Sequence, residues 1–136
     1  MIRIEVSIGE LFDKISILRL KVRYIQDSLK LSNINNELGL LLNVVESHKL
    51  QYILSTPEFD NLHTINAELW KTEDTIREQE EKNDFGAEFI KHARLDAYWN
   101  DKRFLAKRAI NELAKSAVVE EKSYTEKTIN REFNES

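Results

Sequence analysis

Apolar residues recur at helical spacing along most of the chain, and this pattern predicts long amphipathic helices. In the first two expected helices the apolar positions alternate between steps of four and three residues, which is typical of helices packed along a neighbour. They are Leu11, Ile15, Leu18, Val22, Ile25 and Leu29 in the first, and Ile34, Leu38, Leu41, Val45, His48 and Tyr52 in the second. His48 is therefore expected on a buried face, as a hydrogen-bonded structural histidine.

Capping residues and turns set the expected limits of these helices. Ser7 with Glu10 fits a capping box, and Thr56 before Pro57 fits an N-cap followed by a first helical position. Asp84 is the expected N-cap of the last helix. A turn is expected at Leu31-Ser32-Asn33, with one bent helix as the alternative. The predicted segments are an extended arm over 1–6, helices over 7–31, 33–54, 57–82 and 86–118, and a polar segment over 119–136.

The arm alternates apolar and polar residues through Ile2, Ile4 and Val6, which is a short strand pattern. No second strand pattern exists in the sequence. The arm is therefore expected to pack as an extended segment or to pair with its copy in another subunit.

The last predicted helix carries two apolar stripes instead of one. We expect the first stripe to close the core of the monomer and the second to contact another subunit. The first contains Ile90, Ala93, Ala97 and Phe104, and the second contains Leu95, Trp99, Ala106, Ile110, Leu113 and Ala117. Together these patterns predict one all-α domain over residues 1–136: a four-helix bundle-like fold with long antiparallel helices and a short extended N-terminal arm, assembled as a homo-oligomer, with a dimer favoured.

The composition limits the expected location of the protein and the kinds of partner it can bind. The chain has no cysteine, which favours a cytoplasmic location and excludes disulfides and thiolate chemistry. No apolar run approaches the roughly 20 residues that a membrane-spanning helix needs. The net charge of −4 argues against general nucleic-acid binding, but residues 73–88 are acidic and residues 91–115 are basic. Two neighbouring helices of complementary charge explain this division, and a basic face for an anionic ligand is the alternative.

Motifs for catalysis are weak. The sequence lacks a zinc-type histidine pair, a nucleophile elbow and a glycine-rich phosphate loop, so we assign no catalytic residue, no metal ligand and no cofactor. Two carboxylate pairs, Glu10 with Asp13 and Glu78 with Glu81, have the spacing that all-helical nucleotide pyrophosphatases use for magnesium. A metal-dependent hydrolase of that kind is our third hypothesis, and we favour a protein that is not an enzyme.

Polar residues beside the apolar stripes form the candidate ligand site. Arginine offers a planar fork for phosphate or carboxylate, asparagine can orient such a group, and aromatic rings can stack on a base. The candidates are Trp70, Glu73, Arg77, Arg94, Tyr98, Asn100, Asp101, Lys107, Arg108 and Asn111. Binding of a nucleotide or another phosphorylated small molecule, for sensing or sequestration, is our first hypothesis. The second is a protein-interaction or scaffold module in which an Arg94–Asp101–Arg108 network only fixes the helix register.

Several blocks of the sequence resemble a small family of uncharacterised bacterial and phage proteins. They are SIGELFDKISIL from Ser7, ELWKTEDTIR from Glu68, ARLDAYWNDKR from Ala93, KRAIN from Lys107 and EEKSY from Glu120. The resemblance covers nearly the whole chain and implies a stand-alone helical domain. It carries no known chemistry to any residue.

Overall fold

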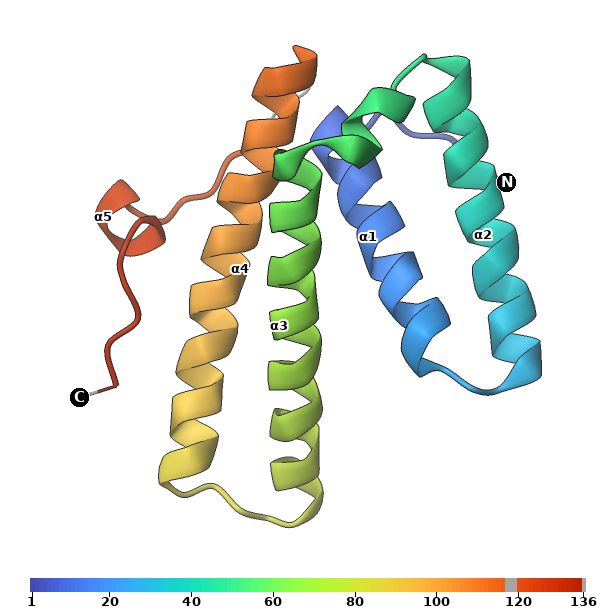
Figure 1. The fold of residues 1–136 in the computed structure, drawn as a ribbon. Helices are drawn as coiled ribbons and strands as arrows, with labels where there is room; N and C mark the ends of the chain where they lie inside the picture. The colour runs from blue at the N-terminus through green and yellow to red at the C-terminus, as the bar shows by residue number, and fades with distance from the viewer. Residues whose placement is uncertain (117–119, 136) are drawn as a thin grey trace.

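Four long helices make up most of the protein in the computed structural model, which describes residues 1–116 and 120–135 (Figure 1). They are α1 (Ile8–Tyr24), α2 (Ser28–Ser47), α3 (Pro57–Glu81) and α4 (Ala87–Ala114), with a short 3₁₀ helix η1 (Gln51–Ser55) and a short helix α5 (Glu126–Ile129). No strand occurs within these described ranges, and the prediction of an all-α, bundle-like fold is confirmed. None of the described helices combines the length and the apolar character needed to cross a bilayer.

The helices form two hairpins that meet at one end (Figure 1). One hairpin is α1 with α2, the other is α3 with α4, and α1 contacts both helices of the second hairpin. The core lies where the hairpins meet, and every element except α5 contributes to it. Its fully buried side chains include Phe12 and Ile15 of α1, Ile53 of η1, Leu62 of α3 and Ile110 of α4. The arrangement brings the start of α1 against the last turns of α4, and this contact positions the candidate site.

The expected caps form at two helix starts. The Ser7 hydroxyl accepts the Glu10 backbone N–H at 3.0 Å, and the Thr56 hydroxyl accepts the Phe59 N–H at 3.2 Å. The predicted start of α3 at residue 57 is therefore correct to the residue. Residues 1–6 belong to no helix or strand and are exposed.

The turn between the first two helices lies earlier than predicted. α1 ends at Tyr24, Ile25 is extended, and the Asp27 carboxylate accepts the Lys30 N–H at 2.9 Å to begin α2. An N-cap at Asp27 thus divides the helix expected over 7–31, and Leu29 lies on the exposed start of α2.

The end of the second helix also differs from the prediction. α2 stops at Ser47, Lys49 takes a left-handed conformation, and the chain continues as η1 up to Ser55. His48 is the C-cap of α2 and its ring bonds the Val44 carbonyl at 2.9 Å, so the expectation of a buried His48 is wrong. The helix ends before His48 reaches the buried face.

The limits of α4 are set by backbone conformation and not by a side-chain cap. Gly86 is the N-cap residue, and the Asp84 carboxylate bonds only the Gly86 N–H, at 3.4 Å, so Asp84 is not the cap. At the other end, Lys115 is left-handed, which ends the helix four residues short of the predicted limit at 118. Residue 118 and Ala117 of the second stripe lie outside the described residues.

The monomer core is closed by the second apolar stripe of α4, whereas the prediction assigned that role to the first. Ile110 (0% exposed) and Ala106 of the second stripe are part of the monomer core, and Trp99 packs against it. The first stripe faces the other way: Ile90 is 57% exposed, and Phe104 is buried near Lys122. The segment over residues 120–135, called here the C-terminal segment, lies along that side of α4 (Figure 1). The second stripe is therefore used within the monomer.

Candidate functional site

The start of α1 is fixed tightly against the end of α4. The Gly9 N–H donates to the Asn111 side-chain oxygen at 2.7 Å, and the Ile8 N–H donates to the Ser116 hydroxyl at 3.1 Å. A Cβ atom at Gly9 would lie 2.3 Å from the Lys107 carbonyl oxygen, a distance that no side chain tolerates. Glycine is therefore required for this close helix crossing. The α4 residues that meet α1 supply unpaired N–H groups of the α1 start with acceptors.

A buried polar network joins α1, α3 and α4 one turn further along. Asp13 is 0% exposed, and its carboxylate accepts a bidentate pair of hydrogen bonds from the Arg103 guanidinium, through Nε at 2.9 Å and through Nη2. The same carboxylate accepts the Asn66 amide at 3.0 Å, and Asn66 also donates to Ser16 at 3.0 Å. The hydrogen bond to Asp13 raises the pKa of Arg103 against the opposing effect of burial. Every oxygen of this buried carboxylate is therefore paired.

The network continues from Ser16 to His63 of α3. The Ser16 hydroxyl lies 2.9 Å from His63 Nδ1. Burial, followed by the charges of Arg19 and Arg23, lowers the pKa of His63, so the ring is neutral at pH 7 and Nδ1 can accept the hydroxyl proton. Ser16 is fully buried, so its hydroxyl has no access to a substrate, and the contact is structural.

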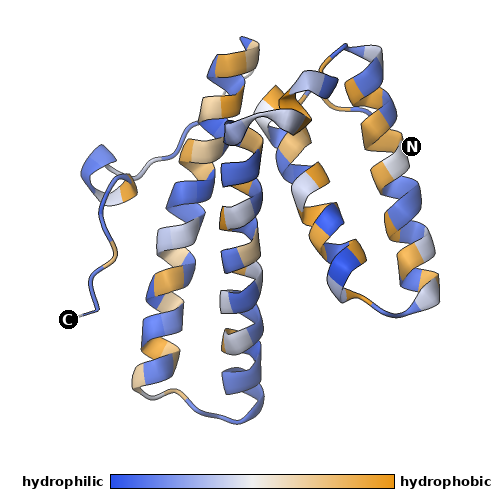
Figure 2. Ribbon diagram, viewed as in Figure 1, coloured by the Kyte–Doolittle hydropathy of each residue, from blue (hydrophilic) through white to orange (hydrophobic). Residues whose placement is uncertain are grey.

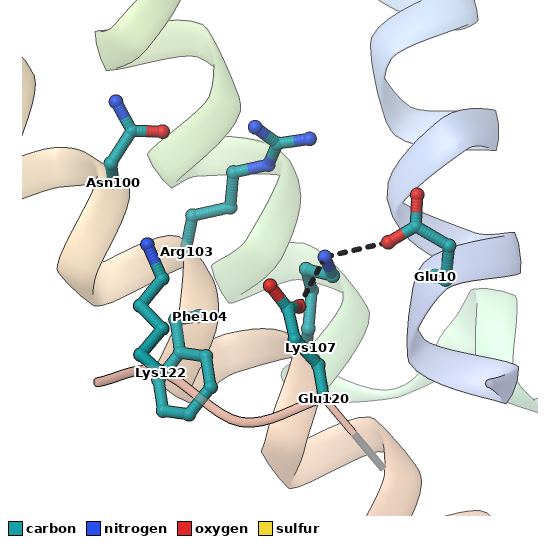
Figure 3. Close-up of a pocket in the computed structure, with 7 residues that line it drawn as sticks. All are labelled: Glu10, Asn100, Arg103, Phe104, Lys107, Glu120 and Lys122. Carbon is teal, nitrogen blue, oxygen red and sulfur yellow. Dashed lines mark ion pairs between the residues drawn. The ribbon is translucent and has the colours of Figure 1, made fainter. Parts of the chain in front are cut away.

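A small pocket opens beside this network, at the junction of α1, α4 and the C-terminal segment (Figure 3). We call it the junction pocket; its volume is about 90 Å³. Its lining comprises three cations, two carboxylates and two further side chains: Arg103, Lys107, Lys122, Glu10, Glu120, Asn100 and Phe104.

Lys107 is the centre of the junction pocket. Its ammonium lies 2.6 Å from Glu10 of α1 and 2.6 Å from Glu120 of the C-terminal segment, as the dashed lines in Figure 3 mark. Burial alone would lower the pKa of Lys107, but the hydrogen bonds to Glu10 and Glu120, together with the charges of Glu10 and Asp13, outweigh it and raise that pKa. Lys122 lies with its ammonium 5.9 Å from the centroid of the Phe104 ring. The pocket thus gathers charges from three separate parts of the chain.

The structure brings four of the ten predicted site residues to this region. Asn100 and Lys107 line the junction pocket, Asn111 holds Gly9, and Asp101 is buried on the adjoining side of α4.

The other six predicted residues lie apart from the pocket. Trp70 stacks on Tyr24 with ring centroids 5.5 Å apart, and the Tyr98 ring lies 5.6 Å from that of Phe133. Arg77 is exposed, and burial and the neighbouring Asp96 carboxyl raise the pKa of Glu73.

The expected Arg94–Asp101–Arg108 line does not form a network. The Arg94 guanidinium bonds the Asn134 carbonyl, and Arg108 lies near Glu112 at 3.8 Å and Glu121 at 3.5 Å. Residues seven apart in a helix share a side, but here the C-terminal segment supplies nearer partners for both arginines.

Sequence reasoning missed most of the residues that join the helices. From the sequence, Glu10 and Asp13 were considered as capping and metal-binding residues, and no role was assigned to Asn66. The available indication was polar residues at core positions: Asp13 and Ser16 lie among the buried apolar residues of α1, and Asn66 among those of α3. Arg103, Glu120 and Lys122 gave no comparable indication, because their roles depend on how distant segments meet.

The carboxylate pairs of the third hypothesis are occupied or exposed. Glu10 binds Lys107 and Asp13 binds Arg103, while Glu78 and Glu81 are exposed on α3. Among the residues that the structure describes, no three His, Asp or Glu side chains are grouped so that they could hold a metal ion.

These features define an all-α protein in which two helical hairpins are joined by a buried polar network beside a small charged pocket. A family model described as "Family of unknown function (DUF6165)" matches residues 2–133. The chain therefore belongs to this family, and the expectation of an uncharacterised family is confirmed at that level. No curated protein and no solved structure matches the chain significantly.

Proposed function

We propose that the protein binds, without catalysis, a small molecule through an anionic group, a carboxylate or a phosphate, in the junction pocket. The observation that carries this proposal is the Lys107 ammonium group, which is buried and yet holds two carboxylates. One of them, Glu120, belongs to the C-terminal segment and not to the helical core. An anionic group of a ligand can take the place of the Glu120 carboxylate, while Glu10 keeps its contact with Lys107.

The other cations of the pocket support the same chemistry. Arg103 uses Nε and Nη2 to bind Asp13, and its Nη1 makes no hydrogen bond to a described residue. Lys122 contacts aromatic rings and forms no ion pair with a described residue. Both can donate to a bound oxyanion without releasing a present carboxylate partner. The volume of about 90 Å³ suits one such group and not a whole nucleotide.

A base-stacking role for Trp70 receives no support from this geometry, because Tyr24 already covers that ring. The proposal is therefore narrower than the nucleotide hypothesis drawn from the sequence. It retains the binding of an anionic group by cationic side chains.

The test is a thermal-shift titration with sodium phosphate and with sodium butyrate, at constant ionic strength adjusted with sodium chloride. A ligand at a hundredfold excess over its dissociation constant stabilises the protein by roughly 2.7 kcal/mol, which appears as a higher melting temperature. Lys122→Gln should weaken binding, and Glu120→Gln should strengthen it by removing the internal competitor. Lys127→Gln removes the same charge from the exposed surface of α5 and is the matched control. Equal or absent shifts in all of these proteins would overturn the proposal.

The proposal also includes assembly of two copies. The accessible area of 9247 Å² exceeds the roughly 7,400 Å² expected for a folded monomer of 16.0 kDa. The difference is larger than the ~800 Å² that each partner buries in a typical stable interface. Part of the excess area is apolar and lies on the N-terminal arm and on α2, at Ile2, Ile4, Leu29, Leu40 and Val44.

α2 is the element most open to such a partner. Among the long helices its main contact is with α1, and Figure 2 shows hydrophobic residues near both of its ends. Sedimentation velocity should give a dimer mass for the wild type. Leu40→Glu with Val44→Glu should give a monomer with an unchanged helical spectrum, whereas a monomeric wild type would contradict the assembly.

The scaffold alternative is supported by the Asp13–Arg103–Asn66 network, in which the contacts are satisfied internally. A cytoplasmic setting, supported by the absence of cysteine, and a bacterial or phage source complete the proposal.

A further inference from the structure

A second pocket adjoins the junction pocket on the other side of Asn100 and Lys122. We call it the side pocket; its volume is about 420 Å³, and its lining includes Asp96, Asn100, Asp101, Lys122, Tyr124 and Arg131. Asn100 and Lys122 line both pockets, so the two spaces are neighbours. In Figure 3 these two side chains border the same side of the junction pocket, across from Lys107 and Glu120.

Asp101 is the unusual residue of the side pocket. Its side chain is only 6% exposed, yet its carboxylate has no hydrogen bond or ion pair to any residue that the structure describes. Arg94 and Arg108, which share its side of α4, are bound to the C-terminal segment instead. A carboxylate that lines a pocket and has no donor within the described chain can accept a charge-assisted hydrogen bond without giving up an existing partner. A cationic group of a ligand would supply that missing partner.

The two pockets differ in charge. The junction pocket is lined by three cations and two carboxylates, whereas the side pocket is lined by two carboxylates, Asp96 and Asp101, and two cations, Lys122 and Arg131. Asp96 has one carboxylate oxygen that is buried without a hydrogen bond, and its other oxygen is 3.4 Å from the Asn100 amide nitrogen. A ligand lying across Asn100 would thus meet Arg103 and Lys107 at one end and the Asp101 carboxylate at the other, with Lys122 lining both spaces.

We propose that the ligand is an amine-bearing small acid, whose ammonium group binds Asp101 in the side pocket while its carboxylate or phosphate binds in the junction pocket. This inference rests on the proposed function and names the class of ligand. Amino acids and aminoalkyl phosphates share this chemistry. Tyr124 and the Lys122 ammonium, 5.5 Å from its ring centroid, border the path between the two ends.

The test compares ligands that differ only in the amine. Calorimetric titrations pair γ-aminobutyrate with butyrate and phosphoethanolamine with ethyl phosphate, against the full-length protein. In each productive pair the amine-bearing member should bind about tenfold more tightly, which corresponds to about 1.4 kcal/mol. Whichever amine-free anion, butyrate or ethyl phosphate, binds more tightly identifies the carboxylate or the phosphate as the preferred anionic group.

The matched variants are Asp101→Asn and Asp74→Asn. Asp101→Asn keeps the shape of the side chain and should remove the preference for the amine, while butyrate and ethyl phosphate bind as they do to the wild type. Asp74 is exposed on α3, so its variant should keep the preference.

Each outcome decides the inference. Equal binding within both pairs by the wild type, or a preference that survives Asp101→Asn, would overturn the inference and leave the proposed function standing. If the amine-free anions fail to bind as well, both proposals are overturned. The comparison of ligands within the wild type needs no variant, so it tests the inference even if the Asp101→Asn protein does not fold.

Discussion

Two buried aspartates, Asp13 on α1 and Asp101 on α4, differ in whether the folded chain supplies partners for their carboxylates. Asp13, between α1 and α4, is bound by Arg103 and Asn66, and the helices around it are in close contact. Asp101, between α4 and the C-terminal segment, is almost as buried and has no partner among the described residues. The first arrangement fixes how the helices pack. The second leaves a carboxylate facing a pocket, where a ligand could bind it.

The largest loss of stability is expected from breaking the ion pair between Asp13 and Arg103. Arg103→Met leaves the fully buried Asp13 carboxylate without its cation, and removing one partner of a buried ion pair typically costs about 3–5 kcal/mol. Urea unfolding followed by circular dichroism should show that loss. Arg77→Met, on the exposed face of α3, should change the free energy of unfolding by less than about 0.5 kcal/mol. Equal effects of the two substitutions would contradict a structural role for the Asp13–Arg103 pair.

A smaller loss of stability is expected from a substitution that forces α1 away from α4. Gly9→Ala places a Cβ against the Lys107 carbonyl, and overpacking of this kind costs about 1–3 kcal/mol. Gly39→Ala is the control, because a Cβ at Gly39 of α2 meets nothing within 4 Å. That variant should gain about 0.5–1 kcal/mol from its better helix propensity. The comparison fails if both alanines shift the urea midpoint in the same direction.

A substitution at Asp101, whose carboxylate has no partner among the described residues, should not reduce the stability. Asp101→Asn removes a carboxylate that has no hydrogen bond or ion pair to a described residue, so the free energy of unfolding without ligand should not fall and should rise by at most about 1 kcal/mol. The urea titration used for Arg103→Met measures it. A loss of stability instead would mean that Asp101 is held by the folded chain as Asp13 is.

The smallest effect is a dependence on pH through His63. Its pKa is lowered in the folded protein, so the unfolded chain binds the proton more readily near the usual pKa of 6.5. The contribution of His63 to stability is then complete above that pH and is lost as the pH falls through the lowered pKa. Because the ring is partly exposed, the loss should stay below about 1 kcal/mol. His63→Asn, whose amide oxygen can still accept the Ser16 hydroxyl, should lose less stability than the wild type between pH 7.5 and 5.5.

The fold was predictable because it depends on periodic apolar positions and local caps. Thr56 with Pro57 set the start of α3, and the long helices followed from the apolar spacing. The break at Asp27 was missed because the apolar spacing continues across it, while a single capping carboxylate ends the register. The wrong choice of the core-facing stripe of α4 has a different cause. Both stripes are apolar, and the pattern alone contains no information about which one meets the core.

The candidate site was predictable only in part. Lys107 and Asn100 could be found as polar residues beside apolar stripes of one helix. Glu10 and Glu120 could not be assigned to the same pocket, since they are far apart in sequence and meet only when α1 and the C-terminal segment reach α4. Trp70 was selected for its ring, but the pairing with Tyr24 depends on the angle between the two hairpins.

The position of the core also determines which parts of the molecule should open locally and exchange their amide protons first. α4 has 28 residues, and at 1.5 Å per residue it extends for roughly 42 Å. The buried core cluster is confined to the end where the hairpins meet. Backbone amides near Glu81 and Ala87 should therefore exchange with deuterium through local fraying, while those around Leu62 and Ile110 should exchange only on global unfolding. Arg103 and Lys107 of the junction pocket stand on α4 near the slowly exchanging end, so these two cations are held in place before any ligand arrives.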